Sequence, residues 1–171
     1  ELELFAHARH WKAYWSSRLR PFVRGRVLDV GAGIGATARL FADAGHDGDY
    51  TAVEPDALLA EHMRADSVAG GYPPNFRVLA GTSAELPADA RFDTILYIDV
   101  LEHIDDDRGE LACAARHLAP GGRILVLSPA HQFLFSPFDA AIGHARRYDR
   151  ASLRAALPPA LAVERLFYLD S

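Results

Sequence analysis

The fold class of this chain is indicated by the stretch Val27-Leu28-Asp29-Val30-Gly31-Ala32-Gly33-Ile34-Gly35. A short, mostly apolar run typical of a strand leads into a turn that contains three glycines. Glycine adopts positive φ angles at little cost, and it leaves room for the backbone to approach a ligand. Together with Ala36, the turn also fits the pattern G-x-G-x-x-A of dinucleotide-binding proteins. Taken alone, the stretch predicts a tight strand-to-helix turn that can accept a nucleotide-like ligand.

Outward from this turn, apolar runs alternate with segments of helical period. Such alternation predicts an α/β fold with a Rossmann-like, doubly wound and mostly parallel sheet. Helices are expected between the strands, one beginning at Pro55-Asp56 and another capped by an aspartate at 105–107. The predicted strands cover residues 26–30, 50–53, 76–80, 92–98 and 123–127, followed by a short helix from about Ser152 and a strand near 161–169.

The ends of the chain suggest how the domain is organised. Phe5, Trp11, Tyr14 and Trp15 recur at roughly helical spacing and predict an N-terminal helix laid across the sheet. The chain starts without Met and stops inside the last predicted strand, so we expect trimmed ends. We expect one domain, divided into a helical cap (1–25), a cofactor-binding core (26–129), an acceptor-side loop (130–148) and a last helix and strand (149–171).

Composition narrows the function classes. The 171 residues suit one domain, and a net charge of −5 does not resemble the basic surface of a nucleic-acid binder. No apolar run approaches the length of about 20 residues that spans a bilayer, and no signal peptide is visible. The single cysteine, Cys113, excludes an internal disulfide framework and fits a reducing compartment. A cytoplasmic protein is therefore expected.

Two carboxylates near the glycine turn suggest a nucleoside ligand. Asp29 lies inside an apolar strand, where a carboxylate is costly unless it is paired. It can organise the turn beside a cationic ligand. Glu54 follows about 20 residues beyond the glycines, where an acidic residue can accept hydrogen bonds from the two ribose hydroxyls. NAD-dependent enzymes share the second feature, so it supports a nucleoside without identifying it.

At this point the sequence resembles the class I S-adenosylmethionine-dependent methyltransferases. The glycine turn is similar to the first motif of that family, and four further stretches follow in the family's order over about residues 26–150. These stretches are Val53-Glu54-Pro55-Asp56, Gly81-Thr82-Ser83-Ala84-Glu85-Leu86-Pro87, the run from Phe92-Asp93 to Leu101-Glu102-His103, and Leu118-Ala119-Pro120-Gly121-Gly122-Arg123-Ile124-Leu125-Val126. The resemblance also implies a C-terminal antiparallel hairpin, of which only the first strand falls within this chain.

The resemblance implies S-adenosylmethionine as methyl donor and S-adenosylhomocysteine as product. By position, the three glycines face the methionyl part of the donor, with Asp29 behind them, and Glu54 binds the ribose. Many relatives have Asp where this chain has Thr82, so adenine recognition here is expected to rely more on backbone groups. The implied cofactor-binding residues are Asp29, Gly31, Gly33, Gly35, Glu54, Pro55, Thr82, Ser83, Asp99 and Val100. The turn Leu101-Glu102-His103 is interpreted mainly as a stabiliser of the fold.

The segment after the fifth strand is the candidate acceptor side. Its Gly143-His144-Ala145-Arg146-Arg147-Tyr148 stretch resembles one bacterial branch of the family, described as methyltransferase domains of type 11, 12 or 23. His131 and His144 are candidate bases because histidine titrates near neutrality, and Asp139 can orient either one. These candidates favour O-methylation of a small-molecule hydroxyl. In the alternative interpretation the stretch is a lock, with Arg147 or Tyr148 pinning the loop to the sheet.

Aromatic residues near the two ends of the site have two interpretations each. Phe133, Phe135 and Phe138 form either an apolar wall for the acceptor or core beneath the loop. The aromatic residues of the N-terminal helix either close over the sulfonium or pack as an ordinary amphipathic face.

Other functions remain open at this point. We expect no metal, since helix capping explains the aspartates at 105–107 and the histidines lack a tight ligand spacing. A non-catalytic domain that binds the donor and regulates a partner is an alternative. An NAD-dependent oxidoreductase is a weaker one, because it explains neither Asp29 nor the turn from Asp99 to His103. The oligomeric state cannot be read from the sequence.

Overall fold

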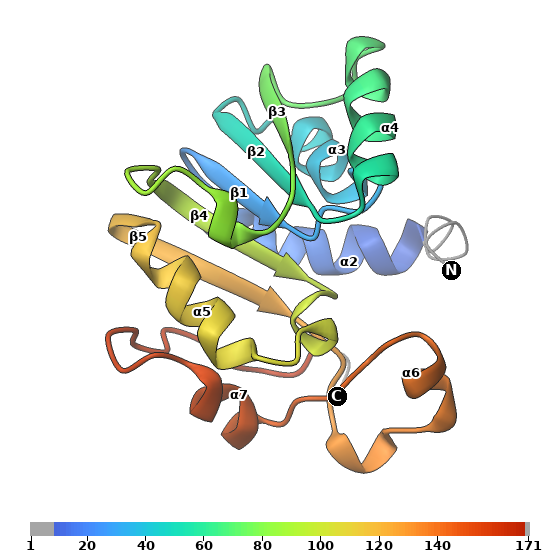
Figure 1. Ribbon diagram of the computed structural model, residues 1–171, viewed down its shortest axis with the longest axis vertical. Coiled ribbons are helices and arrows are strands. Elements are labelled where there is room, and N and C mark those ends of the chain that lie inside the picture. The colour runs from blue at the N-terminus through green and yellow to red at the C-terminus, as the bar shows by residue number, and fades with distance from the viewer. Residues whose placement is uncertain (1–8, 170–171) are drawn as a thin grey trace.

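The computed structural model describes residues 9–169, and it contains one parallel sheet of five strands in the order β3-β2-β1-β4-β5 (Figure 1). All four neighbouring pairs are parallel. The chain moves outward from β1 to β3, then returns to the other side of β1 for β4, so the strand order reverses between β1 and β4. The doubly wound sheet predicted from the sequence is confirmed. The strands are β1 (Val27–Val30), β2 (Asp49–Glu54), β3 (Asn75–Ala80), β4 (Phe92–Ile98) and β5 (Leu118–Leu127).

Helices cover both faces of this sheet. Their bounds are α2 (Arg9–Leu19), α3 (Ala36–Asp43), α4 (Ala57–Val68), α5 (Asp107–Arg116), α6 (Pro137–Ala141) and α7 (Arg150–Ala156). Four single turns of 3₁₀ helix join them, namely η1 (Arg20–Phe22), η2 (Ser83–Glu85), η3 (Leu101–His103) and η4 (Gln132–Leu134). No helix in the stretch from 9 to 169 is long and apolar enough to cross a bilayer.

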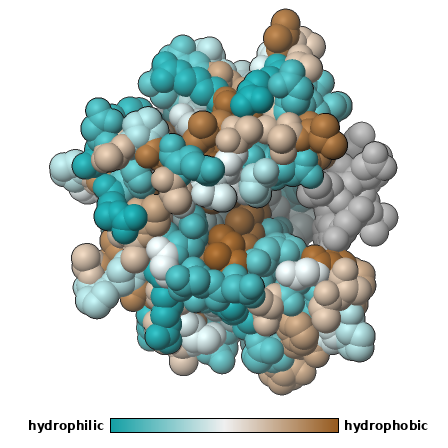
Figure 2. All heavy atoms as spheres, in the orientation of Figure 1, coloured by the Kyte–Doolittle hydropathy of each residue, from teal (hydrophilic) through white to brown (hydrophobic). Residues whose placement is uncertain are grey.

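The core divides into two layers because successive strand residues point to opposite faces. On one face Leu28, Ile95 and Tyr97 pack with Leu111 of α5 and Ala156 of α7. On the other face, buried residues of the strands pack against α2 and α3, and this layer contains Trp15, Leu19, Val27, Ala38, Phe41, Tyr50 and Leu96. The surface on the α5 side is mostly polar, with a small apolar area near the middle of the view (Figure 2).

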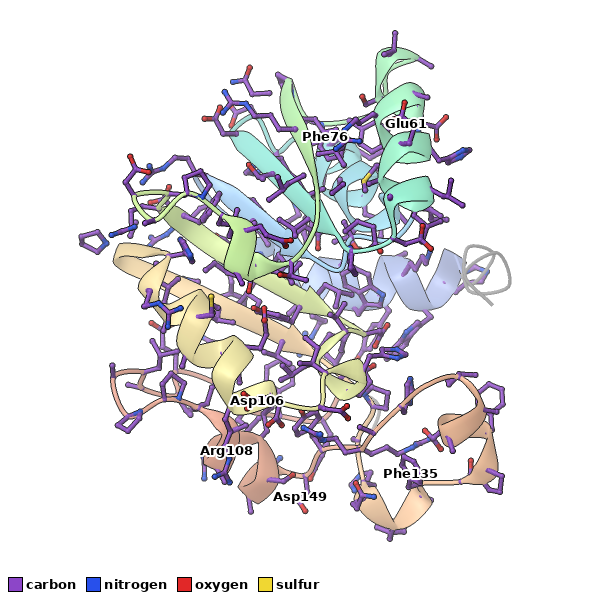
Figure 3. The ribbon with its side chains drawn as sticks, viewed as in Figure 1. Glu61, Phe76, Asp106, Arg108, Phe135 and Asp149 are labelled. Atoms are coloured by element: carbon purple, nitrogen blue, oxygen red, sulfur yellow. The ribbon has the colours of Figure 1, made fainter. Side chains whose placement is uncertain are left out.

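Side-chain caps set where several helices begin. Asp56 accepts hydrogen bonds from the backbone N–H groups of Leu58 and Leu59 and caps α4. Of the three aspartates at 105–107, Asp106 is the cap, and it accepts from the N–H of Gly109. Asp149 caps α7, and Figure 3 shows Asp106 and Asp149 at the starts of their helices. Each cap satisfies N–H groups that the helix itself leaves unpaired.

The predicted N-terminal helix is present as α2, which packs against α3 on one face of the sheet. Trp15 is buried in the core, whereas Trp11 and Tyr14 are exposed. Phe5, which belongs to the same predicted pattern, lies outside the described residues.

The predicted strand near 161–169 is wrong for the described part of the chain. These residues form no regular element, and their one backbone–backbone hydrogen bond joins the N–H of Leu161 to the carbonyl of Pro158. The segment runs beside β5 without pairing with it, and its residues line a cleft together with those of β5. Apolar alternation makes a strand only where a neighbouring strand supplies the hydrogen bonds.

Candidate functional site

The glycine turn lies at the carboxyl end of β1, next to the point where the strand order reverses. In open α/β sheets this is where ligands bind. The N–H groups of Gly31 and Ala32 both donate to the carbonyl of Val53, at 2.8 and 3.1 Å. Gly31 has a φ of +66°, and a Cβ there would lie 2.8 Å from both Cγ atoms of Val100. Only glycine therefore fits between the ends of β1 and β4.

Glu54 connects the glycine turn to the end of β2. One of its carboxylate oxygens accepts a hydrogen bond from the N–H of Gly33 at 2.8 Å, and the other accepts from the N–H of Asp56 at 2.9 Å. The residue is buried. Each carboxylate oxygen can accept more than one hydrogen bond, so the group retains capacity for ligand hydroxyls.

Asp29 lies behind the glycine turn and is buried. Its carboxyl accepts a hydrogen bond from the hydroxyl of Tyr50 at 2.9 Å, and the two side chains share one face of the sheet. Burial raises the pKa of the Asp29 carboxyl to about 7, an effect that the Tyr50 hydrogen bond opposes. Asp29 does not line the cleft, and its role behind the glycine turn stays a prediction.

A cleft of about 1080 Å³ opens beside the glycine turn. Gly31 and Gly33 line it from one side, and Asp99 lines it from the end of β4. Asp99 has a φ of +53°, an uncommon conformation for a residue other than glycine. Although Asp99 remains exposed to the cleft, desolvation by its walls and the charge of Glu102 raise its pKa to about 7.

The remaining predicted cofactor residues lie outside this cleft. The hydroxyl of Thr82 donates to the carboxylate of Glu85 at 2.8 Å, within a capping box that fixes η2. Ser83 is buried, and its hydroxyl has no hydrogen-bond partner among the described residues. The residues that do not line the cleft are Asp29, Gly35, Glu54, Pro55, Thr82, Ser83 and Val100.

Helix α2 adds residues to the cleft that sequence reasoning missed or left open. Trp11 and Trp15 line it, and so does Lys12, the single lysine of the chain. Burial lowers the pKa of the Lys12 ammonium, and the nearby charge of Asp99 opposes that shift. The local sequence around Lys12 does not predict that it lies near Asp99, because the packing of α2 on α3 brings the two residues together.

Asp139 is the centre of the acceptor-side loop, which extends past the carboxyl end of β5 (Figure 1). The guanidinium of Arg147 donates to both carboxylate oxygens of Asp139, at 2.7 and 3.1 Å. The backbone N–H and the hydroxyl of Ser136 also donate to it, both at 2.9 Å. The Arg147 guanidinium, helped by Ser136 and His144, holds the pKa of the buried Asp139 carboxyl well below its usual range.

The structure brings His144 to Asp139 and to the turn after β4. The Nδ1 atom of His144 lies 3.1 Å from a carboxylate oxygen of Asp139, and its Nε2 lies 3.9 Å from Oε1 of Glu102. His103 stacks edge-on against His144, with ring centroids 4.6 Å apart. Glu102 is buried. Glu102, His103 and His144 line the cleft, whereas Asp139 does not. Asp139 thus orients His144.

Two further side chains, Tyr148 and Arg146, fasten the loop to the fold. Tyr148 is buried, and its hydroxyl donates to Asp107 of α5 at 2.7 Å. The guanidinium of Arg146 pairs with the same carboxylate at 2.8 Å and donates to the carbonyl of Asp105. These contacts match the lock interpretation of the stretch from 143 to 148, and they coexist with a His144 that faces the cleft.

His131 and the phenylalanines are placed differently from His144. His131 lines the cleft and stacks on Tyr168, and no described hydrogen bond joins its ring to Asp139. Phe133 and Phe138 are exposed, and none of the three phenylalanines lines the cleft. They therefore form neither the acceptor wall nor the core expected from the sequence. The interior of the loop is occupied instead by the polar contacts of Asp139. Figure 3 shows Phe135 in this loop.

A family model described as a methyltransferase domain matches residues 5–160 of the chain. A demethylmenaquinone methyltransferase of Tropheryma whipplei is 32% identical over 136 residues, which cover 78% of this chain and 54% of that protein. A ubiquinone biosynthesis O-methyltransferase of Xanthomonas axonopodis pv. citri is 30% identical over 113 residues, covering 66% and 46%. The chain thus spans about half the length of these curated relatives.

Solved structures give the same fold. A glycopeptide N-methyltransferase, MtfA, in complex with S-adenosyl-L-methionine superposes with a TM-score of 0.58 and 26% identity, covering 72% of this chain and 55% of that one. The YcgJ protein of Bacillus subtilis has the same fold, with a TM-score of 0.69 at 24% identity over 84% and 65%. The chain therefore belongs to the methyltransferase family and has the class I methyltransferase fold.

Proposed function

We propose that this chain transfers a methyl group from S-adenosylmethionine to a hydroxyl of a small-molecule acceptor. The observation that carries the proposal is one cleft with two different walls. Gly31, Gly33 and Asp99 line it on one side, and His144, oriented by the buried Asp139, lines it on the other. A donor on the first wall and an acceptor on the second would face each other at the carboxyl edge of the sheet.

The cofactor half of the proposal rests on the glycine turn and on family membership. A glycopeptide methyltransferase with this fold binds S-adenosyl-L-methionine in its crystal structure. In the present chain the glycine backbone would accommodate the methionyl part, and Glu54 would accept hydrogen bonds from the ribose hydroxyls. Pro55, Thr82, Ser83 and Val100 would complete the nucleoside side.

The acceptor half of the proposal concerns a proton. The acceptor oxygen attacks the methyl carbon in line with the sulfur, the C–S bond breaks, and S-adenosylhomocysteine leaves with the electron pair. The hydroxyl proton must go to a base. Asp139 occupies Nδ1 of His144, so the Nε2 atom, which lies 3.9 Å from Oε1 of Glu102, is the one that would take the proton. We assign His144 as this base, with His131 as the second imidazole of the cleft.

Calorimetric titration tests the cofactor half. S-adenosylmethionine, S-adenosylhomocysteine and NAD are titrated into the chain and into Glu54→Ala. We expect micromolar binding of both adenosyl ligands, no binding of NAD, and an affinity at least 10-fold weaker in Glu54→Ala, because a charge-assisted hydrogen bond to the ribose is lost. The exposed Glu61→Ala, on α4, is the matched control and should bind as the parent does.

The outcomes separate the alternatives. Binding of NAD alone, or of no ligand, would refute the proposed function. Tight binding of the adenosyl ligands without turnover in a screen of phenols and other hydroxyl acceptors would favour a non-catalytic donor-binding domain.

A further inference from the structure

A cluster of three potential metal ligands lies at the acceptor side of the cleft. Glu102, His103 and His144 each offer one ligand atom, and these atoms all lie within 4.8 Å of one another. Glu102 and His103 come from the turn after β4, whereas His144 comes from the loop after β5. All three residues line the cleft. The fold therefore brings together two histidines and one carboxylate as potential metal ligands, although their spacing along the chain does not indicate a metal site.

The carboxylate of Glu102 is only half satisfied. Its Oε2 atom accepts a hydrogen bond from the hydroxyl of Ser128 at 2.6 Å. Its Oε1 atom is fully buried, yet it has no hydrogen-bond partner within the described part of the chain. A buried carboxylate oxygen without a donor is costly. Nε2 of His144 lies 3.9 Å from Oε1, which is too far for a hydrogen bond.

Each of the three ligands is already held by an outer partner. Asp139 lies on Nδ1 of His144 at 3.1 Å, and the carbonyl of Gly143 lies 3.2 Å from Nδ1 of His103. With both Nδ1 atoms donating, the two Nε2 atoms present lone pairs. Ser128 holds Glu102 in the same way. Ligands in metalloproteins are oriented by such outer hydrogen bonds, typically from a carboxylate or a backbone carbonyl to a ligating histidine.

We propose that Glu102, His103 and His144 bind a divalent transition-metal ion of the Zn²⁺ type. Two imidazoles and one carboxylate suit Zn²⁺ and similar ions, and three protein ligands leave a fourth position open. Because all three ligands line the cleft, an acceptor in the cleft would reach that position. The ligands would close in from their present separations to bonds of about 2.0–2.2 Å, which the exposed His103 allows.

The proposal deepens the proposed function and, for its catalytic consequence, rests on it. A Zn²⁺ ion on these three ligands would hold the acceptor oxygen at its open position and lower the pKa of the hydroxyl. Nε2 of His144 would then bind the ion instead of taking the acceptor proton, so in the metal-loaded protein His131, the second imidazole of the cleft, would replace His144 as the base. Metal binding itself does not depend on the identity of the acceptor.

Calorimetric titration of Zn²⁺ into the chelator-treated chain tests the site, with Mg²⁺ as a second probe. We expect one Zn²⁺ per chain, no comparable Mg²⁺ binding, and an affinity about 100-fold weaker in His103→Ala. His103 is exposed, so this variant should retain its fold, as thermal unfolding in EDTA would check. His62→Ala, which removes an exposed histidine of α4, is the matched control and should bind Zn²⁺ as the parent does.

Absence of stoichiometric Zn²⁺ binding, or equal binding by the parent and His103→Ala, would overturn the proposal. In that case the hydrogen bonds of Glu102 with Ser128 and of His144 with Asp139 account for the positions of these side chains without an ion. Titration of S-adenosylmethionine in EDTA distinguishes the two failures. Retained donor binding without Zn²⁺ binding rejects the metal site alone, whereas loss of donor binding rejects the proposed function.

Discussion

The two walls of the cleft are built by different means. On the donor side, the glycine turn is positioned by backbone groups, since Gly31 and Ala32 donate to the carbonyl of Val53 in the neighbouring strand. On the acceptor side, the loop from 130 to 148 is positioned by side chains, with Asp139 and Arg147 at its centre. The donor side is thus an extension of the sheet, whereas the acceptor side depends on a few polar contacts.

This difference shows how a methyltransferase can keep one wall constant and vary the other. Backbone hydrogen bonds and glycine geometry tolerate little change, because a Cβ at Gly31 would collide with Val100. A loop held by side chains changes with single substitutions. Three predictions test the contrast, in decreasing order of expected effect.

The largest effect concerns Asp29 on the donor side. Folding raises its pKa from 3.8 to about 7, so between about pH 4 and pH 7 the folded protein retains a proton that the unfolded chain has released. The free energy of unfolding therefore falls as the pH rises through this window and is level above it. Asp29→Asn lacks this titration. Relative to the parent, it should gain roughly 3–4 kcal/mol between pH 4.5 and pH 8.

Urea denaturation at the two pH values measures this gain. Asp99 titrates in the same range in both proteins and cancels in the comparison. The exposed Asp89→Asn is the control and should show no such gain. A constant difference between Asp29→Asn and the parent at both pH values would mean that Asp29 is not desolvated behind the turn.

The second effect concerns Arg147 on the acceptor side. Arg147→Ala leaves the buried Asp139 carboxylate without its cation, and we expect the Tm to fall by about 10 °C. Hydrogen exchange should accelerate in the loop from 130 to 148 before it does in β1 and β4. Arg108→Ala, at an exposed position of α5, should leave both measurements unchanged. Uniform acceleration across the sheet would contradict the idea that side chains hold this loop separately.

The smallest effect concerns Tyr148. Its hydroxyl donates to Asp107, which also pairs with Arg146, so Tyr148→Phe removes one of two fastenings. We expect a loss of about 1 kcal/mol in the free energy of unfolding, measured by urea denaturation. Tyr168→Phe removes a hydroxyl for which no described hydrogen bond is present and should be neutral. A loss well above 1 kcal/mol would identify Tyr148 as the main lock of the loop.

The donor side could be predicted from the sequence because its determinants are local. The apolar run and the glycines between residues 27 and 35 give the strand, the turn and the start of α3 without reference to the rest of the chain. Glu54 was identified by its spacing from the glycines. Its bond to the N–H of Gly33 shows how closely it lies to the turn, although its contact with a ribose stays a prediction.

The acceptor side could be predicted only in part. Asp139 was expected to orient either His131 or His144, and the fold places it beside His144. Glu102 was interpreted only as part of a turn that stabilises the fold, and Lys12 gave no comparable signal, because packing between distant segments brings it to the cleft. The prediction of a strand near 161–169 was wrong for a related reason. Apolar alternation along the chain does not show whether a neighbouring strand is present to form the hydrogen bonds.

The contacts of Asp139 also bear on how such proteins diversify. Ser136, His144 and Arg147, which satisfy that carboxylate, all come from the same short segment of chain. The segment therefore supplies the partners of its own central carboxylate, whereas Tyr148 and Arg146 anchor it to α5 and Ala145 and Gly143 bond to the turn after β4. Recombination between related proteins could therefore exchange the segment from 130 to 148 as a unit. Under the proposed function, such an exchange would change the acceptor preference and leave the glycine turn unchanged.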